Sequence, residues 1–205
     1  MQFTEEVAVR SGALIEAVVK SLHTTFHPMQ VIKGGSAGKN TDVPGSDIDL
    51  VVIMQDYDYK QLASYRSLAL QELQKSAAIV DPIKIEREIK VGISILVRTD
   101  TDERSVDLLF TGDPDVNAYN NPPFCYGCFL ALDQCKYVKE MKTKYPLLHD
   151  NIIKFKVAAF EQRKGVYGIK CPSYFIELLI IKDFEENGQV PDPATVYRRQ
   201  RGVYA

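Results

Sequence analysis

Three aspartates on two predicted strands are the residues of this chain whose types and spacing could do chemistry. Asp47 and Asp49 stand two apart in "SDIDLVVIM", so on a strand both side chains point to one face while their apolar neighbours point to the other. Asp107 alternates with apolar residues in "RSVDLLF" in the same way. If the two strands are neighbours, three carboxylates converge, and like charges that close raise one another's pKa values. A divalent cation removes this repulsion, and Mg²⁺ prefers carboxylate oxygens.

A glycine-rich segment, "VIKGGSAGKNTDVPG", lies just before Asp47. Gly34 and Gly35 lack Cβ atoms, so the backbone can approach a ligand closely. Ser36 and the following N–H groups can form a nest for phosphate, and Lys39 adds positive charge. The spacing differs from a P-loop, because only three residues separate the outer glycines and asparagine follows the lysine. Alone, such a segment is a flexible turn, and an Asp-x-Asp pair alone is an exposed strand start. Together with Asp107, they predict a turn that holds triphosphate beside a metal-binding strand.

The hydrophobic pattern divides the chain into an α/β half and an α-helical half. Helical spacing predicts helices over 5–27 and 58–78, and strands are expected over 29–33, 47–54 and 104–110. Alternating isoleucines and valines over 83–97 predict two half-buried strands that turn near Lys90–Gly92. The turn formers of "TGDPDVNAYNNPPF" mark a boundary, beyond which helices are expected over about 128–143, 147–164 and 173–186.

The segment "KGGSAGKNTDVPGSDIDLVV" closely resembles the signature of the 2′-5′-oligoadenylate synthetase and cyclic-GMP-AMP-synthase-like branch of the DNA polymerase β nucleotidyltransferases. The resemblance implies an α/β (α+β) catalytic core with a mixed sheet over residues 1–112, and a helical lobe over 113–205 that completes the nucleotide cleft. It implies that Gly35 and Ser36 grip a triphosphate. Asp47 and Asp49 would bind two Mg²⁺ ions, for which Mn²⁺ can substitute, and Asp107 would complete the metal site.

The helical half agrees with this resemblance. "KCPSYFIELLIIKDFE" looks like the synthetase segment under the donor nucleotide, which implies that Ser173 lies near phosphate and Tyr174 stacks on the base. Base stacking on an aromatic ring is worth about 1–3 kcal/mol. "NIIKFKVAAFEQ" resembles the helix that supplies cationic contacts to the triphosphate, with Lys154 the better candidate and Lys156 the weaker. On spacing alone, the better interpretation of Tyr174 is a core residue, and lysines on a helix are usually solvated.

Three features depart from the family pattern. The family usually continues well past this length, with more helices in its second lobe. Asn40 stands where the synthetases commonly have glycine, and Val157 stands where a cation is expected. The asparagine at position 40 predicts an altered turn. The missing cation at position 157 predicts weaker binding of the donor nucleotide rather than altered chemistry.

The implied reaction is nucleotidyl transfer from ATP or GTP with release of pyrophosphate. An acceptor hydroxyl would attack the α-phosphate, with Asp107 accepting its proton, to give 2′-5′-linked oligoadenylates or a related cyclic oligonucleotide. Two alternatives stay open: a catalytically inactive RNA-binding scaffold of the same fold, and a poly(A) or terminal uridylyl transferase. The presence of all three aspartates favours an enzyme, and the glycine segment with "PSYFIELL" favours the synthetase branch.

Composition and charge restrict the partners. The chain has 205 residues and a net charge of −2, so no global field draws nucleic acid, and no apolar run approaches membrane-spanning length. The acidic N-terminus lacks a signal-peptide core. We therefore expect a cytoplasmic protein, with the nucleus as the alternative. The synthetases need double-stranded RNA, for which the candidate contacts, equally well interpreted as solvated charges, are Arg10, Lys20, Arg198, Arg199 and Arg201.

The cysteines allow a second metal hypothesis. Cys125, Cys128 and Cys135 could form a four-ligand zinc site with His149 or Cys171. No second paired ligand motif exists, and three cysteines near an aromatic helix are more often small buried hydrophobes. Zinc is therefore the less favoured interpretation, and an uneven set of four cysteines does not indicate a secreted disulfide scaffold.

Overall fold

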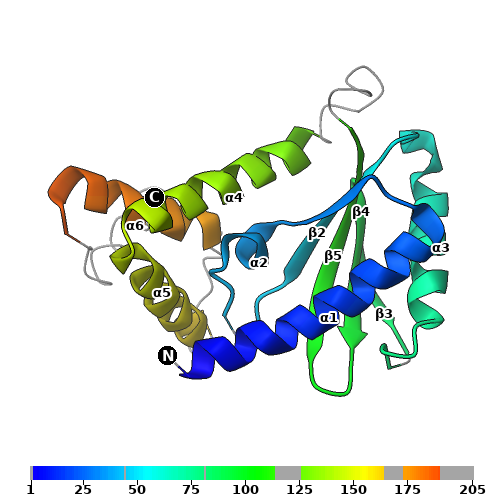
Figure 1. Ribbon diagram of the computed structural model, residues 1–205, viewed down its shortest axis with the longest axis horizontal. Coiled ribbons are helices and arrows are strands. Elements are labelled where there is room, and N and C mark those ends of the chain that lie inside the picture. The colour runs from blue at the N-terminus through cyan, green and yellow to red at the C-terminus, as the bar shows by residue number, and fades with distance from the viewer. Residues whose placement is uncertain (1, 44, 81, 114–125, 164–172, 190–205) are drawn as a thin grey trace.

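The computed structural model describes residues 2–43, 45–80, 82–113, 126–163 and 173–189 (Figure 1). A five-stranded sheet forms the centre of the N-terminal half, in the order β1-β2-β5-β4-β3. Strands β2 (Ile48–Met54) and β5 (Glu103–Gly112) run parallel, and β1 (Gln30–Lys33), β4 (Gly92–Arg98) and β3 (Lys84–Ile89) complete the sheet through antiparallel pairs. The expected proximity of the two aspartate-bearing strands is therefore confirmed.

Helices α1 (Gln2–Phe26) and α3 (Leu62–Gln74), the latter preceded by the 3-10 turn Tyr59–Gln61, pack on one face of the sheet. Figure 1 shows α1 crossing in front of the strands. The alternate apolar residues of β2, β4 and β5 point into this layer. The largest fully buried side chains there are Leu14, Leu22, Ile48, Leu50, Leu73, Ile93, Ile95, Leu108 and Phe110. The other face of the same strands is thus left for the aspartates.

The helical half consists of α4 (Tyr126–Lys144), α5 (Leu147–Arg163) and α6 (Ser173–Asn187), close to the predicted ranges. The start of α4 covers part of the second sheet face, where Cys128 packs with Val51 and Ile53. The three helices share their own apolar cluster, which includes Val138, Ile152 and Ile180. In the described ranges, none of the helices combines the length and apolar character needed to cross a membrane.

One local prediction was wrong, and another was confirmed. The glycine-rich segment is a short helix, α2 (Gly35–Lys39), where a turn was expected. Its backbone closes because Gly38 N donates to Gly34 O at 2.6 Å, and it ends at Asn40, whose φ of 51° is a left-handed conformation that glycine adopts and asparagine tolerates. The two strands predicted over 83–97, with a turn near Lys90–Gly92, are confirmed as β3 and β4. The break in the alternation at Arg87 is a bulge between Ile85 and Arg87, and Ile85 is 58% exposed.

The mixed sheet with helices on its faces agrees with the α/β (α+β) core that the resemblance implied. The parallel β2–β5 pair lies at the centre of the sheet, so its side chains are shielded on both edges by neighbouring strands.

Candidate active site

Asp49 and Asp107 lie directly opposite each other on β2 and β5. Paired positions of neighbouring strands share a face, so the two carboxyl groups stand on the face that α1 and α3 do not cover. Asp107 is buried, and its Oδ1 accepts no hydrogen bond within the described structure. Burial raises the pKa of Asp49 to about 6, and the negative charges of Asp107 and Asp47 add to this, while Lys39 and Arg87 oppose it.

Helix α2 contacts Asp49 directly at Gly35. A Cβ on Gly35 would lie 1.7 Å from Asp49 Oδ2, and the φ of Gly35 is +51°, a conformation that side chains rarely adopt. The preceding Gly34 N donates to the Asp49 carbonyl oxygen at 2.8 Å. The glycines therefore bring the first turn of α2, with Ser36 half-buried in it, against the carboxylate. The first N–H groups of a helix have no intrahelical acceptor and can face an anion.

The three aspartates supply the ligand type that Mg²⁺ prefers. Asp47 is exposed and directly precedes β2, and the buried Oδ1 of Asp107 needs a partner. Across the described ranges, however, no three Asp, Glu, His or Cys side chains already stand together as a ligand cluster. Without a cation the carboxylates repel one another, and Arg87 Nη2 lies 3.4 Å from Asp107 Oδ2. Binding of Mg²⁺ would therefore require these side chains to converge.

Lys39 lies between the carboxylate site and the helical half. Its Nζ is 2.5 Å from Glu177 Oε2, and both side chains are buried. Because that oxygen accepts no hydrogen bond of good geometry, the contact is an ion pair and not an aligned hydrogen bond. The same ammonium stands 5.1 Å from the ring centre of Tyr174, a half-buried residue at the edge of the apolar cluster of α4, α5 and α6. The predicted roles of Lys39 and Tyr174 toward a nucleotide stay predictions.

Further polar side chains from distant parts of the chain lie around Glu177. Thr41 Oγ1 donates to Glu177 Oε1 at 2.7 Å, and Lys156 Nζ donates to the Thr41 carbonyl at 2.6 Å and to Glu177 Oε1 at 3.2 Å. Lys142 Nζ donates to two carbonyls at the end of α2, at 2.6 and 3.0 Å. Burial lowers the pKa of Lys156, and it lowers the pKa of Lys142 to about 8. Lys154, the favoured candidate from the sequence, is exposed.

Sequence reasoning missed Glu177, Thr41 and Lys142. A signal was present for Glu177, a single carboxylate inside the apolar run "YFIELLII". A buried carboxylate needs a cationic or hydrogen-bonding partner, so its position on an otherwise apolar helix predicts an internal polar contact. The partners lie as far as 136 positions away in the sequence, so no residue pattern around Glu177 identifies them.

The cysteines of the zinc hypothesis do not come together where they are described. Cys128 and Cys135 are buried thiols. Cys128 belongs to the apolar cluster against β2, and Cys135 Sγ lies 3.5 Å from the Gly35 carbonyl oxygen. Cys125 and Cys171 fall outside the described residues, as do the tail arginines and the side chains of Ser173 and Arg10. Lys20 is exposed on α1.

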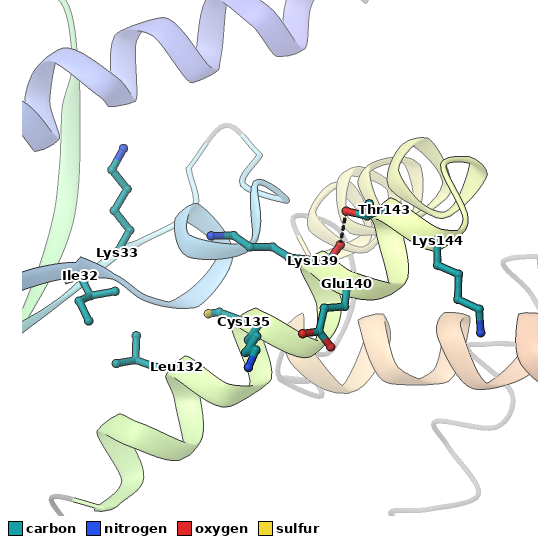
Figure 2. A pocket seen from close by; sticks show the side chains of 9 residues that line it. Ile32, Lys33, Leu132, Cys135, Lys139, Glu140, Thr143 and Lys144 are labelled. Atoms are coloured by element: carbon teal, nitrogen blue, oxygen red, sulfur yellow. Dashed lines mark hydrogen bonds between the residues drawn. The ribbon is translucent and has the colours of Figure 1, made fainter. Parts of the chain in front are cut away.

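A basic pocket of about 570 Å³ lies between β1 and α4. Lys33 and Lys139 come from its two walls, and Leu132 with Ile32 supplies an apolar surface (Figure 2). The full lining is Ile32, Lys33, Leu132, Cys135, Lys136, Lys139, Glu140, Thr143 and Lys144, which includes four lysines and one glutamate. Through Cys135 the pocket touches the back of α2.

Residues 15–108 match the sequence model of the nucleotidyltransferase domain family. No curated protein sequence matches the chain. Similar solved structures include the non-canonical poly(A) polymerase complex GLD-2–GLD-3, with 18% identity and a TM-score of 0.62, covering 89% of this chain and 54% of that one. The Cid1 poly(U) polymerase bound to Mg 3′-dATP has 17% identity, a TM-score of 0.60 and coverage of 89% and 54%.

Terminal uridylyl transferase 4 from Trypanosoma brucei with bound UPU is similar at 14% identity and a TM-score of 0.57, covering 90% of this chain and 56% of that one. The chain thus spans a little more than half the length of these structures. Identities this low show a shared fold. Together with the family match over the core, they support a nucleotidyltransferase, and they do not single out the synthetase branch that the sequence motif resembles.

Proposed function

We propose that this chain transfers a nucleoside monophosphate from a nucleoside triphosphate to the hydroxyl of a nucleotide acceptor and releases pyrophosphate. The observation that carries the proposal is the in-register pairing of Asp49 and Asp107 against Gly35, with a buried Asp107 oxygen that has no hydrogen-bond partner among the described residues. Like charges directly opposite each other on neighbouring strands are destabilising, so the arrangement makes physical sense only when a cationic ligand accompanies it.

Each residue of the site has a proposed role. Asp47, Asp49 and Asp107 would hold Mg²⁺, which when bound supplies charge neutralisation at the attacking and leaving oxygens. The N–H groups at Gly35 and Ser36 position the β- and γ-phosphates of the donor. The Oδ1 atom of Asp107, which has no described hydrogen-bond partner, accepts the proton of the attacking hydroxyl.

The start of α6 is proposed as the rest of the donor site. Tyr174 stacks on the base, and Ser173 with the exposed Lys154 contacts phosphate. Lys39 lowers the pKa of Asp49 and so favours the ionised carboxylate that a cation needs.

Two classes of product are proposed, and a different observation supports each. The glycine and aspartate motif resembles the oligoadenylate synthetase branch, which favours 2′-5′-linked or cyclic oligonucleotides. The similar solved structures are a poly(A) polymerase, a poly(U) polymerase and a terminal uridylyl transferase, which favours addition of nucleotides to an RNA end. All three aspartates are present, which argues against an inactive scaffold.

Double-stranded RNA stays the proposed activator in the synthetase case. The lysine-lined pocket of β1 and α4 offers a concentrated basic surface, in contrast to the isolated Lys20. Binding through phosphate contacts falls steeply as salt rises. Replacement of Lys139 by glutamate, which reverses one charge of that pocket, should weaken RNA binding and flatten its salt dependence.

The proposal is tested by Mg²⁺-dependent pyrophosphate release from ATP, with the products separated by chromatography. Asp107→Asn removes the proton acceptor without changing side-chain size, and the rate should fall by about 10²–10⁴-fold. Asp56→Asn, an exposed position after β2, is the matched control and should keep the wild-type rate. ATP alone, ATP with double-stranded RNA and ATP with a single-stranded RNA end distinguish the two products. Near-wild-type activity of Asp107→Asn would overturn the assignment.

A further inference from the structure

Arg87 reaches the carboxylate face of the sheet only because β3 contains a bulge. Ile85 pairs with Ile95, but Arg87 pairs with Ser94, so two residues of β3 stand against one of β4. In an unbroken ladder, residues two apart share a face, and Arg87 would lie with Ile85 on the side of the apolar core. The extra residue moves it to the opposite face, where Ser94 pairs in turn with Asp107.

The result is one lateral row of polar side chains across four strands. Asp49 on β2, Asp107 on β5, Ser94 on β4 and Arg87 on β3 occupy successive paired positions. Arg87 Nη2 lies 3.4 Å from Asp107 Oδ2, and the arginine side chain is 62% exposed. The guanidinium therefore approaches Asp107 from the side away from Asp49 and α2.

The ion pair between Arg87 and Asp107 is too weak to explain why an arginine stands at this position. At 3.4 Å and with one partner largely exposed, such a pair contributes little to stability. It uses one of the five N–H donors of a guanidinium. A planar fork of donors on the open side of a transfer site is the arrangement that recognises a phosphate group in two places at once.

We propose that Arg87 binds a phosphate of the acceptor strand and so places the acceptor hydroxyl against Asp107. This rests on the proposed function. In-line transfer puts the leaving pyrophosphate and the attacking acceptor hydroxyl on opposite sides of the reacting phosphorus. The donor triphosphate belongs beside Gly35 and Asp49, so the acceptor lies over β4 and β3, where Arg87 stands.

The assignment makes the acceptor an oligonucleotide with a phosphodiester close to its reactive end. A nucleoside, a sugar or a protein hydroxyl would leave Arg87 without its ligand. A purely electrostatic role predicts something different: if Arg87 only offsets the charge of Asp107, its loss changes the Mg²⁺ concentration needed for activity and leaves acceptor affinity unchanged.

The test compares Arg87→Ala and Arg87→Lys with wild type in binding of a fluorescein-labelled single-stranded oligo(A), measured by anisotropy over a range of salt. Lys75→Ala is the control, because it removes one positive charge from α3 on the opposite sheet face. Arg87→Ala should weaken binding about tenfold, since a charge-assisted hydrogen bond is lost. The slope of log affinity against log salt should become shallower by about 0.7.

Arg87→Lys should recover part of the affinity, because the charge remains and the fork is lost. In turnover with the same oligonucleotide, Arg87→Ala should raise the acceptor KM about tenfold and leave the ATP KM within about twofold. Binding of oligo(A) by Arg87→Ala equal to that of wild type and Lys75→Ala overturns the inference. A wild-type chain that binds oligo(A) but releases no pyrophosphate refutes the proposed function, while the binding comparison still decides the role of Arg87.

Discussion

Replacement of Asp49 by asparagine should stabilise the metal-free protein while abolishing its activity. The pKa of Asp49 is raised from 3.8 to about 6, first by burial and then by Asp107 and Asp47. Each pH unit between two pKa values is worth about 1.36 kcal/mol, so the ionised Asp49 carboxylate costs up to about 3 kcal/mol at neutral pH. Asparagine has nearly the same size and carries no charge, so the variant avoids this cost.

The pH dependence of folding determines the direction of the predicted change in unfolding free energy. The folded protein holds the Asp49 proton more tightly than the unfolded chain does, so this residue favours folding below pH 3.8 and loses that contribution as the pH rises to about 6. The free energy of unfolding of Asp49→Asn should therefore match that of wild type near pH 4 and exceed it by up to about 3 kcal/mol near pH 7.

Urea unfolding in the presence of a chelator measures this difference. Asp56→Asn, which lies outside the site, should show a difference from wild type that does not vary with pH. Added Mg²⁺ should stabilise wild type and leave Asp49→Asn unchanged, because a ligand stabilises only the state that binds it. A variant that is less stable than wild type at neutral pH, or a difference that is flat with pH, would refute the view that repulsion and burial strain this carboxylate.

Two further substitutions test the surroundings of the site. Gly35→Ala places a Cβ against Asp49 at a positive φ, so it should cost about 1–3 kcal/mol of unfolding free energy and most of the pyrophosphate release; Gly12→Ala in α1, with open space around it, should be neutral or stabilising. Glu177→Ala leaves buried ammonium groups unpaired and should cost about 3–5 kcal/mol in urea unfolding, whereas Glu186→Ala, in an exposed pair, should cost less than about 1 kcal/mol. Similar costs for Glu177→Ala and Glu186→Ala would contradict the buried cluster.

The strands that carry the aspartates could be predicted because their information is local. Alternation of apolar and polar residues assigns a face to each side chain, and the two runs around Asp49 and Asp107 are apolar enough to belong at the centre of a sheet. Once they are neighbours, a shared face follows from the period of two, and the register found in the structure agrees with it.

The bulge and the short helix α2 could not be predicted in the same way. Arg87 interrupts the alternation of β3, but the interruption alone does not say whether the strand bulges or merely exposes a charge. Gly35 and Gly38 have poor intrinsic helix propensity, so local preference favours a turn. Tertiary contacts decide otherwise: Lys142 of α4 donates to the two carbonyls that end α2, and Gly34 N donates to the Asp49 carbonyl oxygen.

These contacts indicate that the N-terminal half depends on the helical half. Gly35 can bring the N–H groups of the proposed phosphate site to Asp49 only while α2 keeps its position. That position is held by Lys142 and by Glu177, which pairs with Lys39; Lys142 lies in α4 and Glu177 in α6. The helices therefore do more than close a cleft, since the alignment of the proposed phosphate site with the carboxylates rests on polar contacts that the helices supply.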